Sequence, residues 1–227
     1  VLTSYLVAVA VFTPLTAWLG RRYGRKRVLL IGIVGFVIAS TIAGRSDSLM
    51  EIVAARFTQG MFGATLIPVA QQILLDAWPK DRHNIALGWF SVGMMVGLIV
   101  GPILGGFLTE FYSWRWNYFV NIPGGLTAFA LIFFFVRENE PDAGRHFDLT
   151  GFILLGTALI CMQLVIDRGE KLSWFQSDEI IMWASISLCA LYLFIVHIIT
   201  ARRPFVDPAL FRNRNFTICS FYLILLG

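Results

Sequence analysis

A single arginine lies inside a long apolar stretch of the chain. Arg56 precedes Gln59 by three residues and Gly60 by four, so the three residues share one face of a helix. If the stretch crosses a membrane, inserting the guanidinium costs at least about 2.5 kcal/mol, and Arg56 is expected to face a wet cavity or an acidic partner. A structural alternative stays open, in which Arg56 extends outward toward Glu51 and the surface.

A second pattern is a glycine repeat within residues 85–109. Glycine recurs there every four residues, on one face of a helix: Gly93, Gly97, Gly101 and Gly105. Gly106 and Pro102 lie beside this stripe, and the proline removes a backbone donor and can kink the helix. A face without side chains lets a neighbouring helix approach closely, so it predicts either a fixed helix contact or a pliable seam at which a bundle opens and closes.

The third pattern is a cluster of positive charge. Five of the eighteen basic residues surround Gly24 within residues 21–27, namely Arg21, Arg22, Arg25, Lys26 and Arg27. Residues 1–19 and 28–44 on either side carry no charge. Two apolar segments joined by a short cationic loop predict a helical hairpin across a bilayer, with the loop in the cytoplasm.

The composition excludes an ordinary soluble protein. Of the residues, 57% are hydrophobic and only 14% are charged, against about 25% in soluble domains, and the mean hydropathy is +0.73. The net charge of +4 follows loop positions instead of forming one face, which argues against nucleic acid as a partner. The three cysteines have no ligand spacing, so we expect reduced thiols and no metal site.

These elements predict an all-α integral membrane protein. Seven apolar runs are long enough to cross a bilayer as helices, at about 1–19, 28–44, 51–75, 85–109, 117–136, 149–166 and 180–200, and a partial eighth covers 216–227. With residues 21–27 inside, the inside loops carry thirteen Lys and Arg residues and the outside loops four. This bias predicts a multi-pass protein of the plasma (inner) membrane with residues 21–27 in the cytoplasm.

The polar loop at 137–148 predicts a boundary between domains. It contains a proline and a glycine and is the longest break before the last two full spans. We expect an N-terminal bundle over 1–136, a cytoplasmic linker over 137–148, two linker spans over 149–200, a cytoplasmic loop over 201–215 and the start of a second bundle at 216–227.

The sequence carries no constellation typical of an enzyme. A phosphate loop, an HExxH motif, a nucleophile elbow and a set of carboxylates on one helix face are all missing from it. We therefore expect no catalytic residues. A membrane-embedded enzyme or scaffold stays a remote alternative.

Three motifs resemble those of the major facilitator superfamily and its drug:proton antiporters. The segment 17–26 is similar to the family's cytoplasmic pattern G-x-L-a-D-r-x-G-r-k, although Ala17 replaces the first glycine and Arg21 the acid. The segment 56–60 resembles the fourth-span pattern in which an arginine precedes Gln-Gly. The segment 97–106 matches the antiporter pattern G-x-x-x-G-P-x-x-G-G completely.

A fourth motif is similar to the signature W-R-W-x-F-x-x-N-x-P-x-G of the fourteen-span, EmrB/QacA-like branch. The matching residues are Trp114, Arg115, Trp116, Asn121, Pro123 and Gly125. The resemblance implies a fragment with the major-facilitator helical-bundle fold that lacks the first span and most of the second bundle. Residues 1–136 would be spans two to six, and the proton-binding acid would lie in the first span.

The resemblance also implies a function. The expected activity is proton-coupled export of amphipathic drugs or toxic compounds by alternating access, driven by the proton gradient without a cofactor. The implied partners are the lipid bilayer, a small amphipathic substrate and protons, with a periplasmic adaptor and an outer-membrane channel in a double-membrane bacterium. An exporter of a defined metabolite or siderophore remains an alternative.

Overall fold

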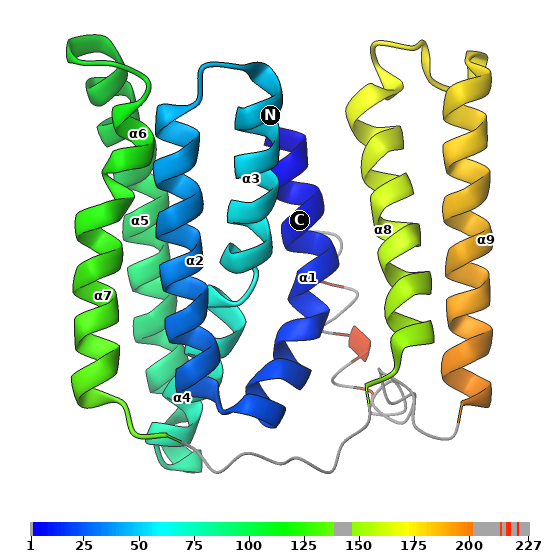
Figure 1. Ribbon diagram of the computed structural model, residues 1–227. Helices are drawn as coiled ribbons and strands as arrows, with labels where there is room; N and C mark the ends of the chain where they lie inside the picture. Colours follow the sequence, from blue (N-terminus) through cyan, green and yellow to red (C-terminus); the bar gives the residue numbers. More distant parts are fainter. Residues whose placement is uncertain (1, 139–146, 202–213, 215–216, 219–221, 223–227) are drawn as a thin grey trace. The chain divides into compact units, whose positions relative to one another are not determined.

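The computed structural model describes residues 2–138, 147–201, 214, 217–218 and 222. Over these residues the secondary structure is helical, without strands. The helices are α1 (Leu2–Tyr23), α2 (Arg25–Arg45), α3 (Leu49–Gly63), α4 (Leu66–Ala77), α5 (His83–Phe111), α6 (Trp116–Phe119), α7 (Asn121–Phe135), α8 (Leu149–Gly169) and α9 (Asp178–Thr200), with 3-10 turns η1 (Lys80–Arg82) and η2 (Trp174–Gln176) (Figure 1).

Seven helical segments within the described residues are long and apolar enough to cross a membrane, which confirms the predicted all-α membrane fold. Two of them join short neighbouring helices, since the third span contains α3 with α4 and the fifth contains α6 with α7. The predicted partial eighth span and the loop at 201–215 lie mostly outside the described residues, as does most of the linker at 137–148.

The cationic segment is more helical than a loop. The last turn of α1 contains Arg21 and Arg22, and α2 begins at Arg25, so only Gly24 separates the two helices. Its φ of 90° belongs to the left-handed region that glycine tolerates and other residues rarely adopt. The predicted seven-residue loop is therefore wrong in length, because one glycine makes the turn and both helices extend into the polar residues.

The third span is broken in its middle, between α3 and α4. Pro68 has no N–H to donate to the carbonyl four residues earlier, at Ala64, and its ring crowds that carbonyl. The chain tightens there instead, with the Thr65 N–H donating to the Phe62 carbonyl at 3.1 Å. At its other end, α3 starts with a capping box between Ser48 and Glu51.

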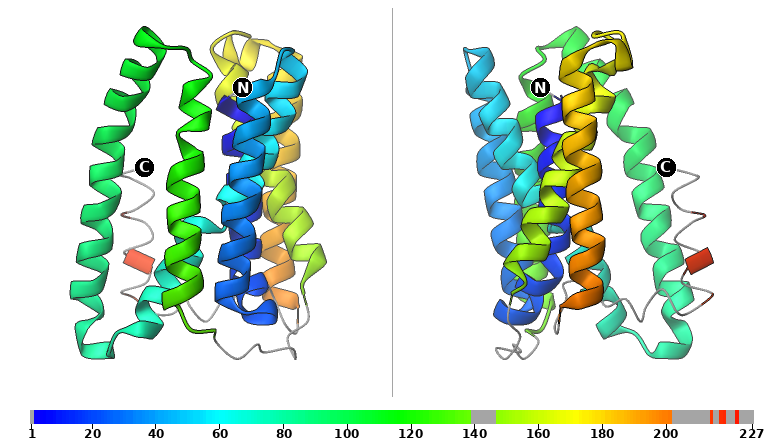
Figure 2. Two further views of the ribbon diagram at one scale, coloured as in Figure 1. Left: turned by 60° about the vertical axis from the view of Figure 1, so that its left-hand side comes forward. Right: turned by 90° about the vertical axis from the view of Figure 1, so that its right-hand side faces the viewer.

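The chain divides into two compact units, Val1–Arg145 and His146–Gly227. In the first, α3 packs against both α1 and α2, and α7 packs along α2 (Figure 2). The buried residues at the centre of this packing are Val28, Leu29, Ile33 and Val69. In the second, α8 and α9 pair side by side, with the Ser187 hydroxyl donating to the Ala158 carbonyl at 2.9 Å.

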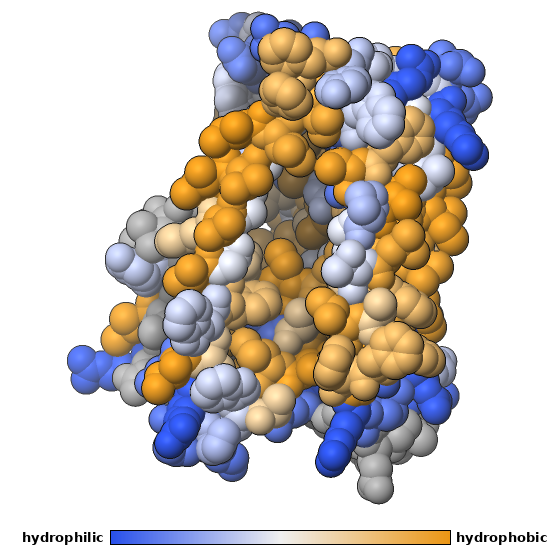
Figure 3. Space-filling model, turned by 90° about the vertical axis from the view of Figure 1, so that its left-hand side faces the viewer, coloured by the Kyte–Doolittle hydropathy of each residue, from blue (hydrophilic) through white to orange (hydrophobic). Residues whose placement is uncertain are grey.

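Helix α5 differs from the other long helices of the first unit. Its main contacts are with α4, η1 and α6, which adjoin its two ends. No residue in the most apolar window of this span is buried. Figure 3 shows this side of the unit, with hydrophobic side chains over its middle, hydrophilic side chains at both ends and a hollow between the helices.

Candidate functional site

Arg56 lies at the centre of a small polar cluster in the first unit. Its Nη1 donates a hydrogen bond of 3.1 Å to Oε1 of Gln59, whose side chain is almost fully buried. The guanidinium carbon lies 4.9 Å from the ring centroid of Tyr118 and 5.7 Å from that of Tyr5. Cation–π contacts of this kind are worth about 2 kcal/mol when desolvated, so the rings partly replace the lost water.

The outward arrangement of Arg56 is not formed. The Glu51 carboxylate instead accepts hydrogen bonds from the backbone N–H groups of Asp47 and Ser48, at 3.0 and 3.4 Å, at the start of α3. Within the described residues Arg56 makes no ion pair, and its buried Nε has no hydrogen-bond partner. The cluster therefore retains an unused donor and an uncompensated positive charge.

Gly60 brings the third helix of this cluster into place. A Cβ added at this position would lie 2.9 Å from the Ala8 Cβ and would collide with the Tyr5 carbonyl oxygen. Only a residue without a side chain allows α1 to come this close to α3, and this approach carries the Tyr5 ring toward Arg56. The structure thus brings together all three residues that the sequence predicts for the cavity.

The tryptophan-rich signature ties the loops at the opposite end from the cationic turn. Arg115 donates to the Asp47 carboxylate at 3.0 Å and to the Ser46 carbonyl at 3.3 Å, and it lies 4.7 Å from the Trp114 ring centroid. It therefore joins the α5–α6 connection to the α2–α3 connection. The Trp116 ring lies edge-on to Phe119, with centroids 6.0 Å apart.

A chain of neutral hydrogen bonds continues from this signature into the membrane segments. Asn121 donates to the Ser40 hydroxyl at 2.9 Å, and that hydroxyl donates to the Tyr118 carbonyl at 2.9 Å. Asn117 donates to the Thr109 hydroxyl of α5 at 2.7 Å, while its own buried Oδ1 has no partner. These bonds fix α6, which carries the Tyr118 ring, against α2 and α5.

The last two signature residues shape α7. Pro123 occupies the first turn of α7 and cannot donate to the carbonyl four residues earlier, at Phe119, where α6 ends. Gly125 lies against Val37 of α2, and a Cβ there would collide with the Val37 side chain. The signature residues thus pack and form hydrogen bonds around the Arg56 cluster.

The cationic turn is held by carboxylates that sequence reasoning missed. Arg25 forms an ion pair with Asp76 at the end of α4, and Arg27 pairs with Glu138 at 3.3 Å. Lys26 donates to the Phe133 carbonyl near the end of α7 at 2.8 Å. The sequence positions could have predicted these ion pairs, because Asp76 and Glu138 follow apolar runs that end on the same side of the membrane as the basic residues.

The other two arginines of the turn point elsewhere. Arg21 donates from Nε to the Ala17 carbonyl at 3.2 Å. Arg22 lies over two aromatic rings, 5.3 Å from the Trp18 centroid and 5.8 Å from that of Tyr23. Arg21, which occupies the acid position of the family pattern, therefore makes one of its hydrogen bonds within its own helix.

The glycine stripe of α5 makes no close contact. A Cβ added at any of Gly93, Gly97, Gly101 and Gly106 would meet nothing within 4 Å. At Gly105 the nearest atom is Asn117 Oδ1, at 3.5 Å. The helix also continues through Pro102 without interruption. Within the described residues of the first unit, no tight helix contact is thus formed at this stripe.

The titratable residues of the described ranges form no metal-binding group. No three His, Cys, Asp or Glu side chains come together there in an arrangement that could hold an ion. The nearest approach to such a group is a pair, in which His197 Nε2 lies 2.9 Å from both carboxylate oxygens of Asp148. What the first unit offers chemically is a half-buried cation with hydrogen-bonding and aromatic neighbours.

Comparison with known proteins identifies relatives over the whole chain. The sequence profile of the Major Facilitator Superfamily matches residues 1–227. The chain is 38% identical over 219 residues to the multidrug export protein EmrB of Escherichia coli (strain K12), covering 96% of this chain and 43% of that protein. It is 35% identical to the fatty acid resistance protein FarB of Neisseria gonorrhoeae, with 96% and 43% covered. It is 32% identical to the putative multidrug resistance protein MdtD of Klebsiella pneumoniae, with 96% and 46% covered. The chain therefore spans less than half the length of these relatives.

Proposed function

The chain belongs to the Major Facilitator Superfamily, and from this premise we propose that it works as part of a secondary transporter that exports amphipathic compounds in exchange for protons. Movement of two helical bundles against each other would expose a site near the middle of the membrane to one side and then the other. On this proposal the first unit supplies one wall of that site, and residues 149–200 supply two linker spans.

The observation that carries the proposal is the environment of Arg56. Its guanidinium lies in a membrane-crossing helix beside Gln59 and the Tyr118 ring, with a buried Nε that has no hydrogen-bond partner. A charged side chain at such depth is costly, and in membrane proteins it typically marks a substrate or proton pathway. Arg56 would lower the pKa of an acid brought near it and would attract negatively charged groups of a substrate.

The substrate class follows from this charge and from the relatives. Relatives are named for multidrug export and, in one case, for fatty acid resistance. A fatty acid has a large apolar part, which suits a site built from membrane helices and aromatic rings. The charge of Arg56 suits an acidic group such as that of a fatty acid, and the Tyr5 and Tyr118 rings suit a cationic drug. Export of one defined metabolite or siderophore is the second candidate.

The energy source in this proposal is the proton gradient, so no cofactor is needed. The proton-binding acid would lie in a span outside this chain. An adaptor in the periplasm and a channel in the outer membrane would extend the path in a bacterium with two membranes. The activity proposed is transport, not catalysis.

The experiment is an efflux assay with the full-length protein in cells. Cells are loaded with ethidium or with lauric acid, and retention is measured with and without an uncoupler of the proton gradient. The proposal expects lower retention of both compounds when the protein is present, and the uncoupler should abolish the difference. If the uncoupler does not change retention in cells with the protein, proton coupling is contradicted. If neither compound is exported, the alternative of a defined substrate is favoured.

A further inference from the structure

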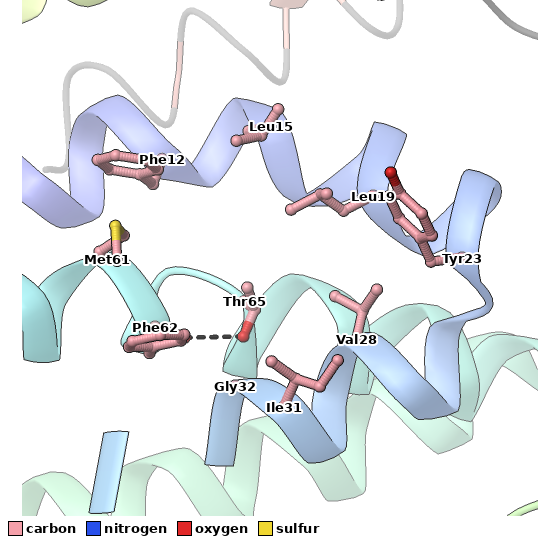
Figure 4. A pocket seen from close by; sticks show the side chains of 10 residues that line it. All are labelled: Phe12, Leu15, Leu19, Tyr23, Val28, Ile31, Gly32, Met61, Phe62 and Thr65. Carbon is pink, nitrogen blue, oxygen red and sulfur yellow. Dashed lines mark hydrogen bonds between the residues drawn. The ribbon is translucent and has the colours of Figure 1, made fainter. Parts of the chain in front are cut away.

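An apolar groove lies between α1 and α2 at the end of the first unit that carries the cationic turn. Its volume is about 410 Å³, within the range of about 300–1,000 Å³ that is usual for ligand pockets. Ten residues line it: Phe12, Leu15, Leu19, Tyr23, Val28, Ile31, Gly32, Met61, Phe62 and Thr65. Figure 4 shows their side chains around the space between the two helices, with α3 at the left bearing Met61 and Phe62. We call this space the α1–α2 groove.

The lining of the α1–α2 groove is almost entirely apolar. Thr65 and Tyr23 are its only residues with polar side chains. The Thr65 hydroxyl donates to the Phe62 carbonyl at 2.7 Å, so its donor is already used (Figure 4). Gly32 lets α2 approach the α3–α4 break, since a Cβ there would collide with the Thr65 hydroxyl. An apolar space of this kind suits a hydrocarbon chain.

The dimensions of the groove match one leaflet of a bilayer. Along α1 the lining extends from Phe12 to Tyr23, which at 1.5 Å per residue is about 16 Å. Half of the hydrocarbon thickness of a membrane is about 15 Å. A single extended acyl chain matches this length and volume.

The mouth of the groove carries a positive charge without a carboxylate partner. Tyr23 is half exposed and lines the groove, and the Arg22 guanidinium lies 5.8 Å from its ring centroid. Within the described residues Arg22 makes no ion pair, whereas Arg25 and Arg27 in the same turn pair with Asp76 and Glu138. One cation of the turn thus remains available at the level where lipid phosphates lie.

We propose that the α1–α2 groove binds an anionic phospholipid of the leaflet at the cationic end, with one acyl chain in the groove and the phosphate at Arg22. The site goes beyond the proposed transport activity, because it needs neither Arg56 nor a proton gradient. The positive-inside rule assigns this leaflet to the cytoplasm. A lipid held there would bridge α1 and α2 on the side away from the α2–α7 contact.

The test is photo-crosslinking of the full-length protein in nanodiscs. The probe is phosphatidylglycerol with a diazirine in the middle of one acyl chain, compared with phosphatidylcholine that carries the same chain. Labelled peptides are mapped by mass spectrometry. The expected result is preferential labelling of Phe12, Leu15 and Met61 by phosphatidylglycerol. Even labelling of the exposed membrane-facing residues, or equal labelling by both lipids, would overturn the proposal.

Two variants with matched controls test the charge and the groove separately. Arg22→Gln should lower phosphatidylglycerol labelling in the groove about fivefold, the effect of one interfacial cation, whereas Arg45→Gln at the opposite end of α2 should not. Leu15→Trp should fill the groove and remove the labelling, whereas Leu6→Trp on the exposed face of α1 should leave it intact.

Unchanged labelling in Arg22→Gln would overturn the assignment of the phosphate even if Leu15→Trp fails to fold. Competition by ethidium or lauric acid would show a substrate path instead and would also overturn it.

Discussion

The glycine faces of α3 and α5 look alike in sequence but behave differently in the structure. At Gly60 of α3, an added Cβ would lie 2.9 Å from Ala8 and would collide with the backbone of Tyr5. At Gly101 of α5, it would meet nothing within 4 Å. The first glycine allows a contact that is made, and the second leaves a face that is open within the described part of the chain.

This difference separates a fixed part of the unit from a free one. Helix α3 carries Arg56 and is held by α1 and α2 on its two sides. Helix α5 is held mainly near its ends, where Thr109 accepts the hydrogen bond of Asn117. Under the proposed function, α3 is the rigid support of the site, and the open stripe of α5 is the surface along which another bundle of the full-length protein moves.

The largest effect on stability is expected for Gly60→Leu. The new side chain meets helix backbone that cannot move aside, so overpacking should cost about 3 kcal/mol or more. Fluorescence-detected size-exclusion after heating would show lost folded protein at temperatures that the native protein survives. Gly88→Leu is the control, because a Cβ at Gly88 of α5 meets nothing within 4 Å. A native-like profile for Gly60→Leu would contradict the close contact of α1 and α3.

Arg56→Ala should have a smaller effect on stability and a large one on transport. It leaves the buried Gln59 oxygen without its donor, at a cost of about 1–3 kcal/mol. We expect normal membrane insertion and loss of uncoupler-sensitive efflux. Arg45→Ala, which removes an exposed cation at the end of α2, should keep efflux. Normal efflux in Arg56→Ala would reduce Arg56 to a structural residue.

Asp76→Asn tests the cationic turn and should have a small effect. The Arg25–Asp76 pair is partly exposed, with side-chain exposures of 24% and 39%, so its loss should cost about 1 kcal/mol or less. A thermal unfolding curve in detergent measures this. The loose surface pair of Asp81 with Arg82, 3.9 Å apart, provides the control Asp81→Asn, for which no shift is expected. A fall as large as that of Gly60→Leu would mean that this turn, and not the glycine contact, holds the unit.

Gly101→Leu should leave stability unchanged, which is the smallest effect in the series. A Cβ at this position meets nothing within 4 Å, so a leucine there does not overpack the helix against a neighbour. The unfolding temperature in detergent should equal that of the native protein and of Gly88→Leu. A clear destabilisation would show that the stripe packs against something in the resting protein.

Much of the fold follows from the sequence, because a helix that crosses a membrane must be apolar over about twenty residues. Seven apolar runs of hydrocarbon length predicted the seven spans found among the described residues. The break in the third span was less visible, because Pro68 acts on the carbonyl four residues earlier and the helix ends near Ala64. The extent of the cationic turn was misjudged because basic residues at helix ends can continue the helix.

The site was predictable only in part, because residue spacing on one helix says nothing about partners on others. The shared face of Arg56 and Gln59 follows from their spacing of three residues. Tyr118 and Tyr5 do not, since they reach Arg56 from other helices. The antiporter glycine pattern predicted either a fixed contact or a pliable seam for α5, and its spacing alone does not say which helix would pack against it.

The most direct test of whether α5 offers a moving surface and α3 a fixed one is an assay of proton-driven transport in proteoliposomes. Full-length native protein, Gly101→Leu and Gly88→Leu are compared for ethidium accumulation under an imposed pH gradient. Gly88 lies roughly 140° around the helix axis from Gly101, so it changes α5 without touching the stripe. The expected result is gradient-dependent accumulation by the native protein and by Gly88→Leu, with none by an equally stable Gly101→Leu. Accumulation by Gly101→Leu at the native rate would contradict the assignment.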